Sequence, residues 1–186
     1  MPKNRSEEIF FEGIFMRKLK KTLLTFLLLA FSLCALHAQS VELQVIQHDE
    51  NQNNIRKQTE IIESTIMEAF FDSGMIITNA PIFAEYDNES DSKIIKTASK
   101  EALEGMCQYL IVVTVDYKKE ASLNPSSEIL SSIEKVTWSL VNVKSGKNKT
   151  SKSYKINKVS KSNNSSDGVK LLAEELFSDM REALEK

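Results

Sequence analysis

The chain has 186 residues, of which 41% are hydrophobic and 27% charged, and its formal net charge is −2. This length suits one ordinary domain plus a targeting segment and excludes two sizeable domains. The composition is that of a soluble globular protein, which excludes collagen-like and disordered chains. Beyond residue 38 the only local basic cluster, residues 144–161, is diluted by Ser and Asn, so nucleic acid is not an expected partner.

Residues 1–38 are predicted to be an N-terminal extension followed by a signal peptide. A basic stretch, Arg17–Lys21, precedes the apolar segment Leu23–Leu36, and the small residue Ala38 offers a cleavage point. The apolar segment has about 14 residues, fewer than the roughly 20 of a membrane-spanning helix, so an uncleaved anchor is the weaker alternative. Met16 stands directly before the basic stretch and is preferred over the first residue as the start of translation.

Cys34 lies inside this apolar segment, which raises the alternative of lipid attachment. A bacterial lipoprotein carries a small residue directly before the modified cysteine, and Leu33 does not fit that pattern. We therefore expect cleavage, with a periplasmic or secreted mature chain that begins at Gln39, keeps only Cys107 and forms no intramolecular disulfide. Six basic and three acidic residues leave with the leader, so 18 basic and 23 acidic residues stay, net −5.

The first part of the mature chain is predicted to alternate strands and helices. Residues 41–47 begin with alternating apolar and polar residues, which indicates a strand. A helix follows from Ile55 and ends at Gly74, a typical left-handed cap, and residues 75–78 indicate a short second strand. The apolar stripe of this helix consists of Ile55, Ile62, Ile66, Ala69 and Phe70.

Residues 79–88 contain Pro81 and no clear period, so they are predicted to be a connecting loop. Asp91 or Ser92 is expected to cap a second helix, after which Gly105 leads into the next strand. The apolar face of this helix should cover the sheet, and it consists of Ile94, Ile95, Ala98, Ala102, Leu103 and Met106.

Tyr109–Tyr117 is the one long apolar run of the mature chain and is predicted to be the central strand. A half-exposed strand alternates apolar with polar residues, whereas Leu110–Val113 are apolar in succession, with Val115 beyond them. This pattern indicates a strand that is covered on both faces.

The rest of the chain is predicted to form an insertion, a hairpin and a helix. Residues 118–132 resemble an insertion, because the sequence Asn-Pro-Ser-Ser within them breaks any regular element. Strands at 133–143 and 150–156, joined by a turn, indicate the hairpin. A final helix opens at Asp167 or Gly168, and its helical spacing is carried by Val169, Leu172, Leu176, Met180 and Leu184.

The predicted fold class is α/β (α+β). It has a single mixed β-sheet of about five strands packed by three helices, in the order β-α-β-α-β-β-β-α. All of these elements fall within residues 39–186, which are predicted to form a single globular domain.

Two stretches resemble a known family. They are the passage from Ala102 through Gly105 into Tyr109–Val113, and residues 138–147, Trp-Ser-Leu-Val-Asn-Val-Lys-Ser-Gly-Lys. Both are similar to the periplasmic α/β domain shared by the curli secretion protein CsgG, the penicillin-binding-protein activator LpoB and the TolB N-terminal domain. The resemblance covers roughly residues 41–186 and implies a bacterial cell-envelope protein with an envelope protein as partner. Assembly into a homo-oligomer, as in ring-forming relatives, is a further implication.

No catalytic, cofactor-binding or metal-binding residue is predicted, and no cofactor is expected. His48, the one histidine of the mature chain, stands beside Asp49 and Glu50, but the side chains of consecutive residues diverge and no second histidine completes a zinc set. A solvated loop residue is therefore expected at this position. Cys107 follows the C-terminal end of a helix, where nothing lowers the pKa of a thiol, so a small buried residue is expected.

Two kinds of function stay open. The preferred one is a non-catalytic protein-interaction domain, with sheet edges and the loops 79–91 and 118–132 as contact surfaces. The alternative is a small-ligand-binding protein or an enzyme with a pocket between helices and sheet. Trp138 could anchor a partner, but its position on one strand face with Val136 and Leu140 favours a place in the core.

Overall fold

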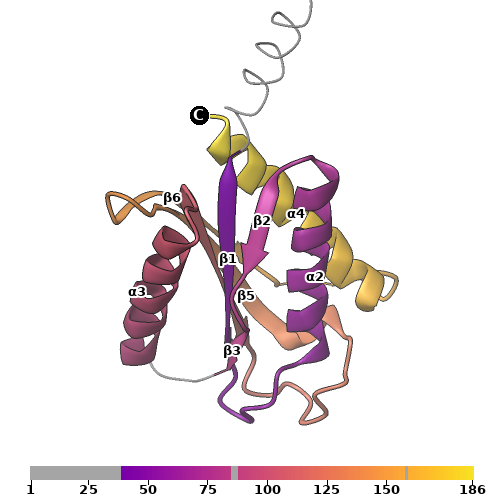
Figure 1. Ribbon diagram of the computed structural model, residues 1–186. Helices are drawn as coiled ribbons and strands as arrows, with labels where there is room; N and C mark the ends of the chain where they lie inside the picture. Colours follow the sequence, from indigo (N-terminus) through magenta and orange to yellow (C-terminus); the bar gives the residue numbers. More distant parts are fainter. Residues whose placement is uncertain (1–38, 85–87, 158) are drawn as a thin grey trace, which may run out of the picture. The chain divides into compact units, whose positions relative to one another are not determined.

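One mixed sheet forms the centre of the structure, a computed structural model that describes residues 39–84, 88–157 and 159–186 (Figure 1). Its strands are β1 (Ser40–His48), β2 (Ile76–Asn79), β3 (Phe83–Ala84), β4 (Tyr109–Tyr117), β5 (Ile133–Asn142) and β6 (Lys147–Lys155). The strand order is β2-β1-β4-β5-β6, and β3 also pairs with β1. β1 is parallel to β2, β3 and β4, whereas β4, β5 and β6 pair antiparallel. The predicted single mixed α/β sheet is confirmed.

Long helices cover the two faces of this sheet. They are α2 (Lys57–Asp72), α3 (Asn88–Glu104) and α4 (Ser166–Leu184), and a 3-10 helix, η1 (Leu130–Ser132), precedes β5. α2 and α4 pack together on one face, and α3 lies on the opposite face (Figure 1). The order of the elements is therefore the predicted one, with β3 and η1 added. Among the described residues, no helix is both long and apolar enough to cross a membrane.

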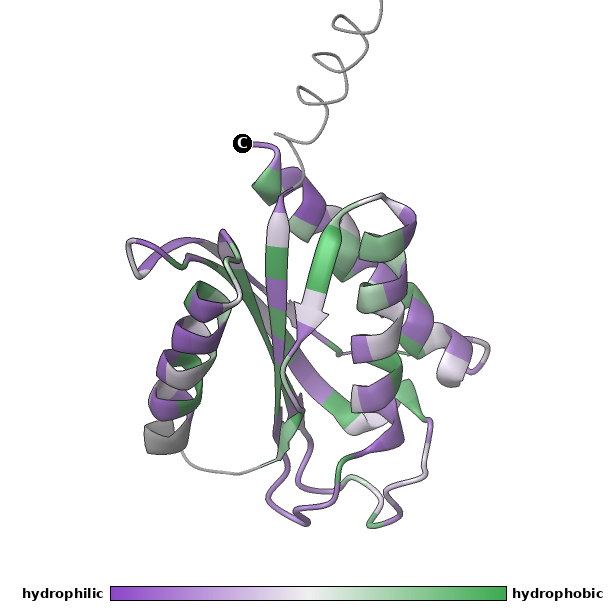
Figure 2. Ribbon diagram, viewed as in Figure 1, coloured by the Kyte–Doolittle hydropathy of each residue, from purple (hydrophilic) through white to green (hydrophobic). Residues whose placement is uncertain are grey.

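β4 is buried on both faces, as its sequence predicted. Ile111 and Val113 belong to the core between the sheet and the pair α2 and α4. Leu110 and Val112 belong to a smaller core under α3. Figure 2 shows the same division, with apolar residues concentrated on the central strands and on the sheet-facing sides of the helices. Each fully buried Val, Leu or Ile side chain contributes roughly 1.5–3 kcal/mol, so these strands anchor the fold.

Several predicted boundaries are corrected by the structure. Ile55 precedes α2 and is 39% exposed, so it does not belong to the buried stripe of that helix. Residues 79–88, predicted to be a loop, contain β3, which is too short to show an alternating pattern. α3 begins at Asn88, which places Asp91 inside its first turn and not at its cap.

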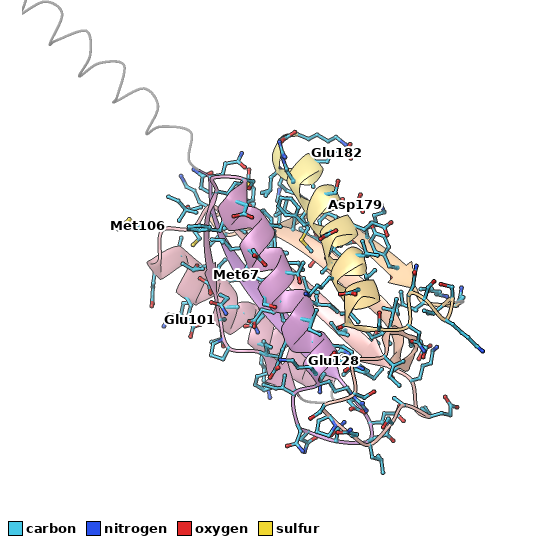
Figure 3. The ribbon with its side chains drawn as sticks, turned by 90° about the vertical axis from the view of Figure 1, so that its right-hand side faces the viewer. Met67, Glu101, Met106, Glu128, Asp179 and Glu182 are labelled. Atoms are coloured by element: carbon cyan, nitrogen blue, oxygen red, sulfur yellow. The ribbon has the colours of Figure 1, made fainter. Side chains whose placement is uncertain are left out.

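The apolar face predicted for α3 is only partly buried. Ala98 and Ala102 are buried, whereas Leu103 and Met106 are 55% and 86% exposed. A helix turns by about 100° per residue, so once Ala102 touches the sheet, Leu103 projects to the side. Met106 lies beyond the last residue of α3 and points away from the ribbon (Figure 3).

The predicted signal peptide lies outside the described residues, as do the proposed start at Met16, the cleavage at Ala38 and the lipidation alternative at Cys34. Residues 85–87, part of the predicted contact loop 79–91, are also outside them. Gln39–Lys186 form one compact unit of the chain.

The connection from α3 to β4 contains a left-handed residue that is not glycine. Met106 has φ 59°, and the N–H of Cys107 donates to the carbonyl of Ala102 at 2.8 Å. Gly74, which follows α2, has φ 77° and confirms its predicted role. Thus the left-handed residue after α2 is a glycine, which tolerates this conformation, whereas the one after α3 is a methionine, which does not.

Met106→Gly is expected to raise the free energy of unfolding by about 1 kcal/mol, because glycine removes the cost of a left-handed backbone and the exposed methionine side chain contributes little packing. Urea denaturation followed by circular dichroism measures the change. Gly74→Ala is the matched control, since an added Cβ there meets nothing within 4 Å and should destabilise through φ alone. A Met106→Gly variant no more stable than the parent would contradict the assigned backbone conformation.

Candidate functional site

A groove of about 470 Å³ lies between α3 and the β2–β3 segment, above β1. One wall is a row on α3, Lys93, Thr97 and Glu101, which recur every four residues and so share one side of the helix. Figure 3 shows Glu101 on this helix. The remaining lining side chains are mostly apolar and comprise Ala80, Pro81, Phe83, Ile94 and Ala98, together with Gln44 from β1.

Gln44 builds the floor of this groove. Its side chain is 4% exposed, and its Nε2 donates to the carbonyl oxygens of Pro81 and Val45, each at 3.0 Å. The bond to Pro81 ties the β2–β3 connection to β1. Because Nε2 is the donor in both bonds, Oε1 is the free end of the amide, and no donor from the described residues reaches it.

Glu42 lies two residues before Gln44, on the same face of β1. It is only 7% exposed, and within the described part of the chain no hydrogen bond or ion pair satisfies its carboxylate. Burial, and then the neighbouring Glu101 carboxylate, raise the pKa of Glu42 above its ordinary value.

The strand beside the groove, β2, is an open edge of the sheet. β1 pairs with one side of β2, and no strand among the described residues pairs with the other. The sequence of β2, Ile-Ile-Thr-Asn, contains neither a charge nor a proline, and Ile76 is 56% exposed. The opposite edge, β6, carries four lysines, which is a common protection against unwanted strand pairing. β2 has no such protection.

The sequence predicted that His48 is a solvated loop residue. This prediction is wrong. It ends β1, where its Nδ1 lies 2.8 Å from Asp116 and its Nε2 lies 2.9 Å from Asp91, and Lys135 lies 2.8 Å from Asp116. With a carboxylate at each nitrogen, the imidazolium can donate twice. The hydrogen bond to Asp116 raises the pKa of His48, and burial opposes this increase without cancelling it.

The acids beside His48 in the sequence have other partners. Asp49 is 4% exposed and accepts a hydrogen bond from the Nε of fully buried Arg56 at 2.6 Å, and Lys119 lies 3.0 Å from Glu50. In the part of the chain that the structure describes, no group of three or more His, Cys, Asp or Glu side chains could hold a metal ion. Cys107 is 8% exposed and lies in the core under α3, which agrees with the expected small buried residue.

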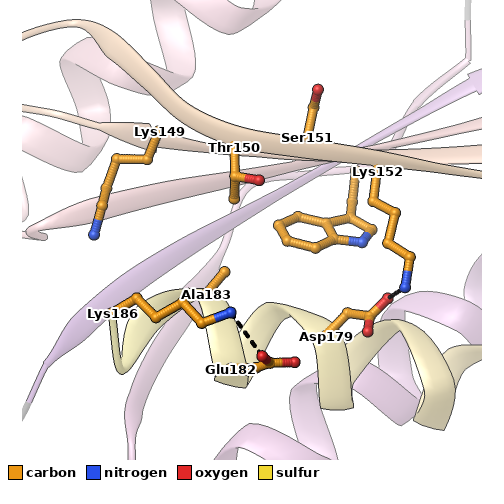
Figure 4. Close-up of a pocket in the computed structure, with 9 residues that line it drawn as sticks. Lys149, Thr150, Ser151, Lys152, Asp179, Glu182, Ala183 and Lys186 are labelled. Atoms are coloured by element: carbon orange, nitrogen blue, oxygen red, sulfur yellow. Dashed lines mark hydrogen bonds and ion pairs between the residues drawn. The ribbon is translucent and has the colours of Figure 1, made fainter.

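A second cavity, of about 360 Å³, lies between β6 and the C-terminal half of α4 (Figure 4). Trp138 contributes to its wall but is 2% exposed, so its predicted place in the core is confirmed. Four of the charged groups here form two pairs: Lys152 binds Asp179, and Lys186 lies 2.6 Å from Glu182 (Figure 4). The buried indole Nε1 of Trp138 has no hydrogen-bond partner among the described residues.

A family model described as "Uncharacterised protein" matches residues 40–185. The chain belongs to this family. A search of curated proteins found no match.

Several solved bacterial structures are similar to this chain at low sequence identity. The PelC dodecamer from Paraburkholderia phytofirmans is 13% identical, with 79% of this chain and 86% of that chain covered and a TM-score of 0.44. Lipoprotein GNA1162 from Neisseria meningitidis is 12% identical, with coverages of 76% and 96% and a TM-score of 0.39. TolB from Acinetobacter baumannii is 8% identical, with coverages of 80% and 28% and a TM-score of 0.42.

TolB is one of the proteins that the sequence resembles, and the resemblance to CsgG and LpoB stays a prediction. All three TM-scores lie below 0.5, so these similarities carry no conclusion about function.

The His48 cluster should make stability depend on pH. A histidine pKa that is raised by folding stabilises the protein fully below the unfolded value near 6.5, and this contribution is lost as the pH rises through the folded value. We expect the free energy of unfolding to fall above about pH 6.5, by at most about 1.4 kcal/mol per pH unit. Urea denaturation between pH 5.5 and 8.5 measures it.

His48→Gln is the informative comparison, because an amide can still bond to Asp91 or Asp116 but does not titrate. The variant should show a smaller pH dependence over the same interval. An unchanged pH dependence in this variant would mean that another group titrates there.

Proposed function

We propose that this domain is a non-catalytic protein-interaction module that binds an extended segment of a partner protein along β2. The observation that carries this proposal is an open, uncharged sheet edge directly beside a groove of about 470 Å³. An extended peptide can satisfy the free backbone groups of an edge strand, while alternate side chains enter neighbouring pockets.

The layout of the groove supports this mode of binding. Pro81 and Phe83 follow β2 in the chain and form part of the groove wall, so a strand added beside β2 would run past them. The α3 wall stands on the same face of the sheet as Thr78, whose Oγ1 lies 3.7 Å from the Sγ of Cys107. Side chains from one face of an added strand would thus point toward α3.

The predicted signal peptide and the resemblance to CsgG, LpoB and TolB support a periplasmic or secreted location for this interaction, with a bacterial cell-envelope protein as partner. A second copy of the chain is another source of an extended segment, because an open edge can pair with its own equivalent. The mass of the mature protein in solution separates these two cases.

A small-ligand-binding function is the second candidate. The volume of the groove lies within the range typical of ligand pockets, and its mixture of apolar walls with a few polar groups is also typical of them. This candidate predicts binding that does not depend on the β2 edge.

The two edges of the sheet allow a matched test of the proposed function. A photo-crosslinking amino acid at Ile76 of β2 should capture a defined partner in intact cells, whereas the same amino acid at Ser151 of β6 should not. A lysine at a neighbouring edge position, Thr78→Lys, should reduce the Ile76 product several-fold, because an edge charge opposes strand addition. Equal products from both edges would refute binding at β2.

A further inference from the structure

The cavity between β6 and α4 has an unsatisfied hydrogen-bond donor in its lining. Trp138 lines this cavity and is only 2% exposed, and its buried indole Nε1 has no partner among the described residues. Four other buried side-chain atoms lack a partner among the same residues, but they line neither this cavity nor the α3 groove. An indole N–H can only donate, and burying it without an acceptor is unfavourable. An acceptor held in the cavity would satisfy it.

Strand pairing places the indole on the side of the sheet where this cavity lies. Trp138 lies opposite Lys152 in the ladder of β5 and β6, so the two side chains share one face. That face is the one toward α4, because Lys152 binds Asp179 of this helix. Thr150 precedes Lys152 by two residues, so its side chain shares the same face and lines the cavity (Figure 4). The β5–β6 hairpin thus presents an indole and a hydroxyl to one space.

Two more donors in the lining have no acceptor in the described part of the chain. Neither the Oγ1 of Thr150 nor the Nζ of Lys149 forms a hydrogen bond or an ion pair there. The Nζ of Lys149 lies 4.8 Å from the ring centre of Tyr109, which is a cation–π contact. This contact leaves the N–H groups of the ammonium available to an acceptor.

The charges in the lining leave one cation without an acidic partner. Lys152 pairs with Asp179, and Lys186 pairs with Glu182, so each of these pairs is neutral. Lys149 is the remaining charged residue, and the three lysines and two acids of the lining give it a net charge of +1. The cavity volume of about 360 Å³ lies at the lower end of the range for small-molecule sites. A small anion with acceptor atoms complements this lining.

We propose that this cavity binds a small organic carboxylate. Its oxygens accept hydrogen bonds from the indole N–H of Trp138 and from the hydroxyl of Thr150, and the ammonium of Lys149 balances its charge. An ionised carboxylate has acceptors only, and its hydrogen bonds are strengthened by its charge. The inference goes beyond the proposed function and does not rest on it, because β6 and β2 are opposite edges of the sheet.

An ordered water molecule is the alternative acceptor for the indole, since buried waters commonly satisfy such groups. A water molecule carries no charge, so it does not account for the ammonium of Lys149 that lacks an acidic partner among the described residues. The charge of the ligand and the charge of Lys149 therefore distinguish a carboxylate from water.

Trp138 is the only tryptophan of the chain, so its indole N–H gives a single resonance that reports on the cavity directly. The probes are N-acetylglycine and N-acetylglycinamide, which are similar in size and differ in charge. Each is titrated into the isotope-labelled mature chain at constant ionic strength. We expect N-acetylglycine to shift the indole resonance saturably and to bind about tenfold more tightly than the neutral amide.

Two lysine variants test the source of this preference. Lys149→Gln should reduce the affinity for N-acetylglycine by about tenfold, because it removes the charge and keeps a donor. Lys147→Gln is the matched control, because it removes a charge from the same strand outside the cavity lining and should leave the affinity unchanged. Both lysines are exposed, so both variants should fold like the parent protein. Equal losses in both variants would show non-specific attraction to β6 and would overturn the proposed site.

The other outcomes are equally decisive. An indole resonance that neither probe moves would leave water as the acceptor and overturn the inference. Equal affinity for the two probes would show that charge has no part in binding, with the same consequence. Inorganic phosphate that binds more tightly than N-acetylglycine would assign the cavity to phosphate and overturn the carboxylate class. None of these results bears on a partner captured at Ile76, so the proposed function is tested separately.

Discussion

The parallel pairing of β1 with β4 is the constraint on which the other features depend. It runs in continuous register from Val41 opposite Tyr109 to His48 opposite Asp116. Because side chains alternate along a strand, this register places one set of β1 residues toward α2 and α4 and the other set toward α3. Gln44 of the groove and His48 belong to the second set.

The buried acidic residues on the two sides of β1 differ in whether a basic residue pairs with them. On the α2 side, Asp49 is paired with the fully buried Arg56, which also lies 4.6 Å from the ring centre of Tyr117. On the α3 side, Glu42 is nearly as buried but has no partner among the described residues. Arg56 is not completely satisfied either, because its buried Nη2 has no hydrogen-bond partner among the described residues.

Much of the fold could be predicted because its signals are local. The run Tyr109–Tyr117 coincides with β4, and the φ of Gly74 agrees with its predicted cap. Predictions that needed the orientation of a helix were less accurate: periodicity places Leu103 near the buried side of α3, but the small residues Ala98 and Ala102 set how the helix rests on the sheet. β3 was missed because two residues carry no pattern.

The sequence by itself determined the class of the fold, the strand that is buried on both faces and the signals for a targeting segment, since these follow from composition and short-range hydrophobic patterns. Only the tertiary structure decided the site. His48 meets Asp91 and Asp116 from 43 and 68 residues away, and the groove brings Gln44 of β1 together with Pro81 and with α3. Such contacts depend on strand pairing and helix placement, which leave no local trace in the order of the residues.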